Sequence, residues 1–155
     1  MKKIIIAVIS LFAVAAVASA QPRAIGGRLG WGMEVSYQHT LGGENFIEAD
    51  LGLGTFNAFN AVATYNIMIA QPSWTPKGEW GFYAGPGAAA TAGFAGYGAF
   101  GLVGNVGLEY TFWFPLQLSV DLRPQIGVAF DKGGAAFYTP GLYGFVPSFS
   151  VRYRF

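Results

Sequence analysis

The chain has 155 residues, of which 53% are hydrophobic, 17% aromatic and 11% charged, and its formal net charge is +1. Such a composition excludes a disordered chain, and the absence of a basic surplus argues against nucleic acid as a partner. There is no cysteine, so disulfides, thiol nucleophiles and zinc-thiolate sites are excluded. The length suits one domain, and 23 glycines beside so few charges are typical of a membrane β-barrel.

The first twenty residues have the layout of a secretory signal peptide. Residues 2–3 are lysines, 4–17 form an almost uninterrupted apolar run, and 18–20 provide small residues where a signal peptidase cleaves. We expect cleavage after Ala20 and a barrel domain over 21–155. The alternative, an uncleaved membrane anchor, requires a longer apolar run. No cysteine is available for lipid attachment, and the mature part has seven Lys plus Arg against eight Asp plus Glu.

Beyond this segment, alternation with period two replaces helical periodicity, and no run of 18 apolar residues occurs. In residues 143–155, for example, every odd position is apolar or aromatic. Turn residues separate these alternating segments and predict an all-β fold. We expect eight strands, at 23–30, 33–40, 45–54, 59–69, 79–90, 98–110, 116–128 and 142–155. Residues 23–40 can also be read as one long strand, but a single-chain bacterial barrel has an even number.

The charged residues of these strands share one face, opposite the aliphatic and aromatic residues. Either this face meets water around an apolar core, as in a soluble ligand-binding barrel, or it lines a narrow lumen in which the charges pair. The signal peptide and the many apolar residues of the other face favour the second arrangement. We therefore predict an eight-stranded antiparallel transmembrane β-barrel with a polar, side-chain-filled lumen. The predicted lumen charges are Arg28, Glu34, Glu48, Asp50, Glu109, Asp121, Arg123, Arg152 and Arg154.

So small a lumen is expected to be closed. Eight strands enclose a space that side chains fill, and an unpaired buried charge is costly, so these residues should form an ion-pair network instead of a conducting pore. A proton or ion path is the functional alternative. Glycines with the same parity are expected to leave room for the long side chains: Gly26, Gly52, Gly81, Gly85, Gly87, Gly101, Gly107 and Gly127.

Aromatic residues gather near the strand ends, as in the interfacial girdles of membrane barrels. The set assigned to the periplasmic rim is Tyr37, Tyr65, Trp80, Tyr110, Phe112, Trp113, Phe114, Tyr153 and Phe155, and the set assigned to the outer rim is Phe56, Phe59, Phe100, Tyr138 and Tyr143. The outer loops are then expected at 30–32, 55–58, 91–97 and 129–141. In the last of these, Phe137 and Tyr138 can contact a partner or belong to the outer girdle.

The carboxyl end resembles the assembly signal of Gram-negative outer-membrane barrels, because it ends in phenylalanine with apolar residues at every second position before it: Phe149, Val151, Tyr153 and Phe155. More broadly, segments such as 24–30, 80–87, 107–110 and 115–124 look like the small eight-stranded, porin-like outer-membrane barrels. The resemblance implies recognition by the barrel-assembly machinery. It also implies contact with outer-membrane lipid and lipopolysaccharide.

Motifs of catalysis and cofactor binding are weak here. The glycine pattern of 96–101 spells a dinucleotide fingerprint, but that motif needs a following helix and a strand is expected. His39 is the only histidine, so a multi-histidine metal site is excluded, and a hydrolase would need it beside a serine such as Ser36. Glu48 and Asp50 have the spacing of an acid–base pair but are more simply explained as ion pairs.

These observations predict a monomeric outer-membrane barrel that is not an enzyme, binds no cofactor, metal or nucleic acid, and has a structural or surface-interaction role in the envelope. A small-solute channel is the first alternative. A lipid-modifying barrel enzyme and a secreted soluble barrel are the others.

Overall fold

The computed structural model describes residues 22–54, 57–139 and 145–155, and nearly all of them lie in strands or in the turns between strands. The expected signal peptide, Phe56 and Tyr143 lie outside these residues. The strands are β1 (Arg23–Leu29), β2 (Gly32–Thr40), β3 (Phe46–Gly54), β4 (Ala58–Ala70), β5 (Glu79–Gly93), β6 (Gly98–Thr111), β7 (Leu116–Leu122), β8 (Gln125–Asp131), β9 (Gly134–Tyr138) and β10 (Ser148–Arg154).

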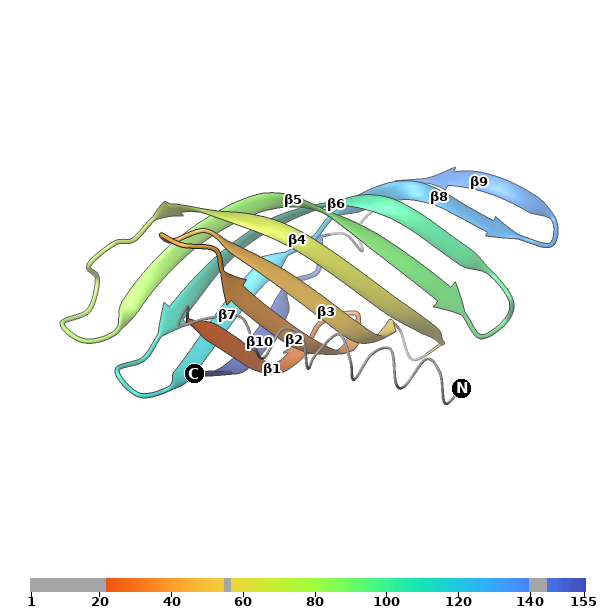
Figure 1. Ribbon diagram of the computed structural model, residues 1–155. Coiled ribbons are helices and arrows are strands. Elements are labelled where there is room, and N and C mark those ends of the chain that lie inside the picture. Colours follow the sequence, from red (N-terminus) through yellow and green to blue (C-terminus); the bar gives the residue numbers. More distant parts are fainter. Residues whose placement is uncertain (1–21, 55–56, 140–144) are drawn as a thin grey trace.

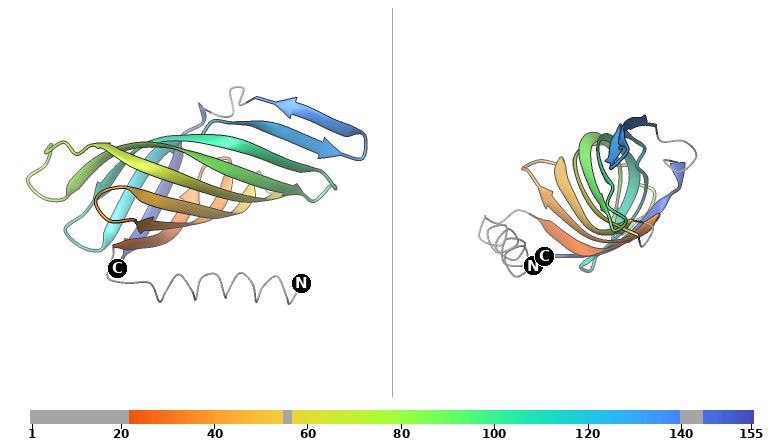
Figure 2. Two further views of the ribbon diagram at one scale, coloured as in Figure 1. Left: turned by 45° about the horizontal axis from the view of Figure 1, so that its top comes forward. Right: turned by 90° about the vertical axis from the view of Figure 1, so that its right-hand side faces the viewer.

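Eight of these strands, β1 to β7 and β10, close into an antiparallel barrel (Figures 1 and 2). The ring closes because β1 pairs with β10, where Gly26 lies opposite Arg152, and because β5 pairs with β6 along nearly their whole lengths. The predicted eight-stranded antiparallel barrel is therefore confirmed. Residues 23–40 form a hairpin and not one strand, since β1 and β2 pair with each other from Arg23–His39 to Leu29–Met33.

The strand β8 continues β7 along the same neighbour. Leu122 lies opposite Val106 and Gln125 opposite Val103, so the register on β6 does not change across the break. Pro124 interrupts the ladder because it has no N–H group, although its carbonyl accepts a hydrogen bond from Gly104 N at 2.9 Å. The predicted strand 116–128 is thus one track along β6, and it extends to Asp131.

The predicted loop 129–141 and the predicted strand 142–155 are both wrong in their bounds. Gly133 N donates to Asp131 Oδ1 at 2.7 Å, and Gly134 has a φ of 138°, so the chain turns within two residues. Residues 134–138 can then pair with β8 as β9, with Ala136 opposite Ala129. Residues 145–147 precede β10, which begins at Ser148. The expected outer loop 91–97 is likewise shorter, because β5 continues to Gly93.

The two ends of the barrel differ. One end carries the start of β1, the carboxyl terminus and the turns 41–45, 71–78 and 112–115, and it lies at the left in Figure 1. At the other end β4, β5 and β6 are longer than β1 to β3, and the β8–β9 hairpin projects beyond the ring. Among the described residues, no helix is long and apolar enough to cross a membrane.

Candidate functional site

Most of the predicted lumen charges are buried within the ring and joined by ion pairs. They lie on β1, β2, β3, β7 and β10 and on the segment after β7, so strands far apart in the sequence supply them. The joined residues are Arg28, Glu34, Glu48, Asp50, Asp121, Arg123 and Arg152. We call this set the interior network.

Arg28 on β1 is the centre of the interior network and is 1% exposed. Its Nη2 donates to Asp121 Oδ1 on β7. Its Nε lies 3.5 Å from Glu34 Oε2, and its Nη1 lies 3.5 Å from Glu48 Oε1 and 3.9 Å from Asp50 Oδ2. One guanidinium thus links the carboxylates of three other strands.

Arg123 and Arg152 complete the pairing. Arg123 Nη1 donates to Asp50 Oδ2 and its Nη2 to Glu34 Oε2, both at 2.5 Å. Arg152 Nη2 lies 2.9 Å from Glu48 Oε1, an ion pair without hydrogen-bond alignment. Because charge-assisted hydrogen bonds are the strong ones, the two that Arg123 donates hold the segment after β7 against β2 and β3.

Neutral polar groups surround Arg152 and its partner. Arg152 Nε donates to Ser36 Oγ at 2.9 Å and Nη1 to Ser119 Oγ at 2.8 Å, while Gln38 Nε2 donates to Glu48 Oε2 at 2.8 Å. Two strands away, Asn105 Nδ2 donates to the Asn66 side chain at 2.9 Å. Buried polar groups need such partners, since each unsatisfied one is costly.

Tyr83 on β5 belongs to the same interior and was missed in the sequence. It is fully buried, its hydroxyl donates to Asp121 Oδ2 at 3.4 Å, and its ring packs edge-on against Phe46 with centroids 5.1 Å apart. A side chain on Gly107 would collide with this ring. Tyr83 has the same parity as the inward Gly81, and this is the sequence signal that places it in the interior. Tyrosine is also typical of the interfacial girdles, so residue type alone does not distinguish the two positions.

Close backbone approach explains most of the predicted inward glycines better than room for arginine does. A Cβ on Gly26 would overlap the Val151 carbonyl oxygen, and one on Gly52 would overlap that of Met33. Gly81 gives room to a side chain, because a Cβ there would crowd Met68 and Glu109. The small ring therefore needs glycine chiefly where neighbouring strands press together.

The interior network separates two cavities and carries a small imbalance of charge. Its three guanidinium groups face four carboxylates, which leaves one negative charge in excess. A cavity of about 930 Å³ lies toward the end with the carboxyl terminus, and one of about 510 Å³, lined partly by Glu34 and Arg123, lies toward the other end.

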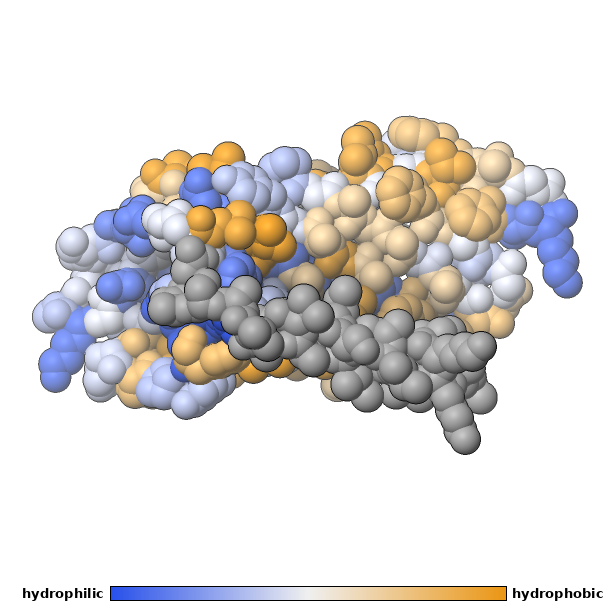
Figure 3. Space-filling view, in the orientation of Figure 1, coloured by the Kyte–Doolittle hydropathy of each residue, from blue (hydrophilic) through white to orange (hydrophobic). Residues whose placement is uncertain are grey.

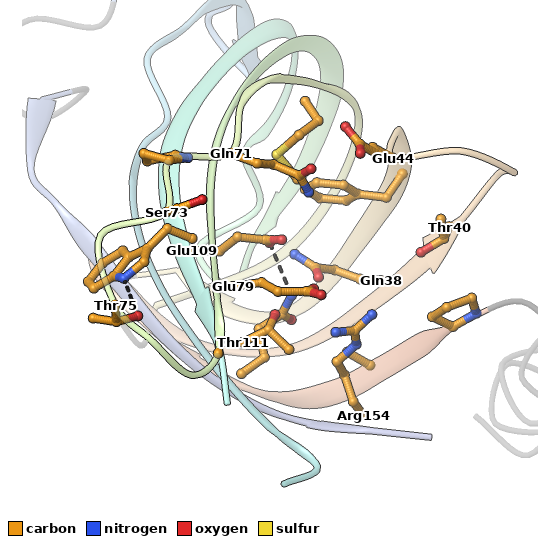
Figure 4. A pocket seen from close by; sticks show the side chains of 18 of the residues that line it. Gln38, Thr40, Glu44, Gln71, Ser73, Thr75, Glu79, Glu109, Thr111 and Arg154 are labelled. Carbon is orange, nitrogen blue, oxygen red and sulfur yellow. Dashed lines mark hydrogen bonds between the residues drawn. The ribbon is translucent and has the colours of Figure 1, made fainter. Parts of the chain in front are cut away.

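Two predicted lumen residues lie apart from the interior network. Glu109 accepts a hydrogen bond from Gln117 Nε2 at 3.1 Å, and Arg154 is half-buried. Neither forms an ion pair within the described part of the chain. Both line the larger cavity, where Figure 4 shows their side chains.

The outward face is apolar on every strand of the ring. Val106 on β6 is 57% exposed, and exposed apolar side chains on other strands include Val35, Ile67, Leu118 and Val151. Among the described strand residues, Arg23 alone combines charge with outward parity, and it is buried. Figure 3 shows hydrophobic residues over β4 to β6 and the β8–β9 hairpin, with hydrophilic residues gathered at the two ends.

The residues of the expected assembly signal all point outward. Phe149, Val151 and Tyr153 are exposed along β10, and Phe155 follows the strand. The rings of Tyr153 and Phe155 stack with centroids 6.4 Å apart. These side chains form one row on the outer surface.

The expected periplasmic rim carries a continuous set of aromatic contacts. Trp80 contacts Tyr110 at 4.6 Å between ring centroids, and Tyr110 contacts Phe112 at the same distance. Trp74, which the sequence analysis did not assign to the rim, lies 5.4 Å from Trp80. The Nζ of Lys77 lies 5.6 Å from the centre of the Trp113 ring. Aromatic rings thus gather at this end, with Lys77 beside them.

The residues considered for catalysis do not come together. Ser36 is buried and bonded to Arg152, whereas His39 lies on the opposite parity of β2, 3.4 Å from the Tyr37 hydroxyl. Within the described residues, no group of three His, Cys, Asp or Glu side chains could hold a metal ion. The glycine pattern at 96–101 leads into β6, a strand. No protein family, no curated protein and no solved structure matches the chain.

Proposed function

We propose that this chain is an integral outer-membrane β-barrel with a structural or surface-interaction role in the cell envelope and no open pore. The outward surface carries the proposal: it is apolar on every strand of the ring, while the charged residues of the strands, apart from the buried Arg23, point inward or lie at strand ends. A soluble protein rarely exposes a continuous apolar surface of this extent. Hydrocarbon is the environment in which such a surface is stable, and closed barrels satisfy every backbone group there.

Two sequence features support the location. Residues 1–20 have the layout of a signal peptide, and the row Phe149, Val151, Tyr153, Phe155 resembles the strand that the barrel-assembly machinery of Gram-negative bacteria recognises. The protein is then a small porin-like barrel, monomeric, in contact with membrane lipid and lipopolysaccharide. The end with the start of β1 and the carboxyl terminus faces the periplasm, and the β8–β9 hairpin faces outward.

The interior network supports a closed barrel. Arg28, Glu48, Asp50 and Asp121 are each at most 2% exposed, and they occupy the space between the two cavities. A small-solute channel is the alternative that these cavities favour, because a path would need only the network to open. Planar-bilayer conductance distinguishes the two: absence of steps supports a closed barrel, and reproducible steps support the channel.

Fractionation of cell envelopes tests the proposal directly. Folded membrane barrels often migrate differently from unfolded ones on gels, so the fraction is run heated and unheated. Recovery in the outer-membrane fraction with a heat-dependent shift supports the proposal. A soluble periplasmic product would contradict it and favour a secreted ligand-binding barrel.

A further inference from the structure

The larger cavity, at the end with the carboxyl terminus, is lined by many polar and charged side chains. Its volume, about 930 Å³, is in the range of ligand sites. Figure 4 shows side chains from several strands and from the turn 71–78 converging on it. The interior network closes the inner end of this cavity, since Gln38, which lines the cavity, donates to the buried Glu48.

The inner part of the cavity holds a carboxylate that forms no ion pair within the described residues. Glu109 is 9% exposed and accepts one hydrogen bond, from Gln117 Nε2. The other atom of that amide, Gln117 Oε1, is buried without a hydrogen-bond partner. A buried carboxylate is stable when paired with a positive group. Within the described residues, Glu109 bonds to the Gln117 amide, and the charges of Arg152 and Arg154 act on it from beyond ion-pair distance.

Charges of opposite sign around the cavity come from different elements of the fold. Arg154 projects from β10, whereas Glu79 comes from β5 and Glu44 from the turn between β2 and β3. Within the described residues, no ion pair joins Arg154 to either acid or to Glu109. The cavity is therefore lined by the guanidinium groups of Arg23 and Arg154 and by three carboxylates, and Arg154 and the three acids form no ion pair within the described residues.

We propose that this cavity binds a small zwitterionic molecule, of the amino-acid or short-peptide class. The ammonium group of the ligand lies against Glu109 and Glu79, and its carboxylate against Arg154, so both charges of the ligand meet opposite charges. A bare cation would meet the same carboxylates but also Arg154, and a neutral sugar would bring no charge to oppose those of Glu109, Glu79 and Arg154. The inference goes beyond the proposed membrane role and does not depend on it.

Isothermal titration of the refolded protein in detergent micelles tests this assignment. The probes are dialanine, N-acetyl-dialanine, dialanine amide and sucrose. Dialanine should bind, and blocking either terminus should weaken binding about tenfold or more, because one charge-assisted contact is lost. Undetectable binding of dialanine, or equal binding of the blocked forms or of sucrose, would overturn the proposal.

Two variants locate the contacts. Glu109→Gln should weaken binding of dialanine about tenfold but leave N-acetyl-dialanine unchanged, since that probe has no ammonium group. Arg154→Gln should also weaken binding of dialanine about tenfold, but it should leave dialanine amide unchanged, since that probe has no carboxylate. Asp131→Asn, at the opposite end of the barrel, is the control and should bind as wild type. If Glu109→Gln does not fold, as judged by the gel shift, the exposed Glu79→Gln takes its place, and wild-type affinity there would contradict the assigned site.

Discussion

Removing Arg28 should leave one specific carboxylate, that of Asp121, without an ion pair. In Arg28→Met, Glu34 and Asp50 keep Arg123 at 2.5 Å, and Glu48 keeps Arg152 and Gln38. Within the described residues, Asp121 keeps one hydrogen bond, from the Tyr83 hydroxyl at 3.4 Å, and no ion pair. Because breaking a buried pair typically costs about 3–5 kcal/mol, the unfolding free energy should fall by about that amount.

The double variant Arg28→Met/Asp121→Asn tests this reasoning more sharply. Neutralising Asp121 removes the unpaired buried charge, so the double variant should be more stable than Arg28→Met by about 2 kcal/mol or more. Urea unfolding in micelles, followed by tryptophan fluorescence, measures both. Arg154→Met is the control, since Arg154 forms no ion pair within the described residues, and its cost should stay below about 1 kcal/mol.

Two results would refute the argument. A loss of less than 1 kcal/mol in Arg28→Met would mean that water or another group replaces the guanidinium. A double variant less stable than Arg28→Met would mean that Asp121 is not the charge left unpaired by the loss of Arg28.

Three further changes test the fold and its setting. Gly26→Ala should impair folding, because its Cβ would overlap the Val151 carbonyl, whereas the adjacent Gly27→Ala, with open space, should fold as wild type; the gel shift compares their yields, and equal yields would contradict the close approach. Val106→Arg should lower stability in vesicles by about 2–4 kcal/mol, against little change for Ser73→Arg at an exposed position of the turn 71–78, and an unaffected Val106→Arg would argue against lipid contact. Deleting Phe155 should reduce the amount of folded protein in the outer membrane, and a normal amount would remove the case for an assembly signal.

Strand parity is local, so the sequence alone assigns a face to each of the nine predicted lumen charges. Once Val151 and Tyr153 are placed outward, Arg152 must point inward. The partners of Arg28 did not follow, because they depend on register and on the curvature that brings β1, β3 and β7 to one level. Those are properties of the closed ring, and no strand specifies them alone.

The errors have equally specific causes. The strand β9 was missed because Ala135 and Ala136 break the alternation and resemble a loop, while the Asp131 side chain and Gly134 make a turn shorter than the glycine-rich sequence suggests. Glu109 and Arg154 share the parity of the interior network but lie toward the end of the barrel. Parity predicts the side of the strand on which a residue lies, whereas its position along the barrel axis depends on the folded barrel.

The side of the barrel that meets lipid is the central claim, and spin labels can test it because the chain has no cysteine to remove. A nitroxide is attached at Val106→Cys on the outward face and at Thr75→Cys in a turn, and the protein is reconstituted into vesicles. We predict that molecular oxygen reaches position 106 while a water-soluble nickel reagent does not, with the opposite preference at position 75. Ready access of the nickel reagent to position 106 would contradict the account.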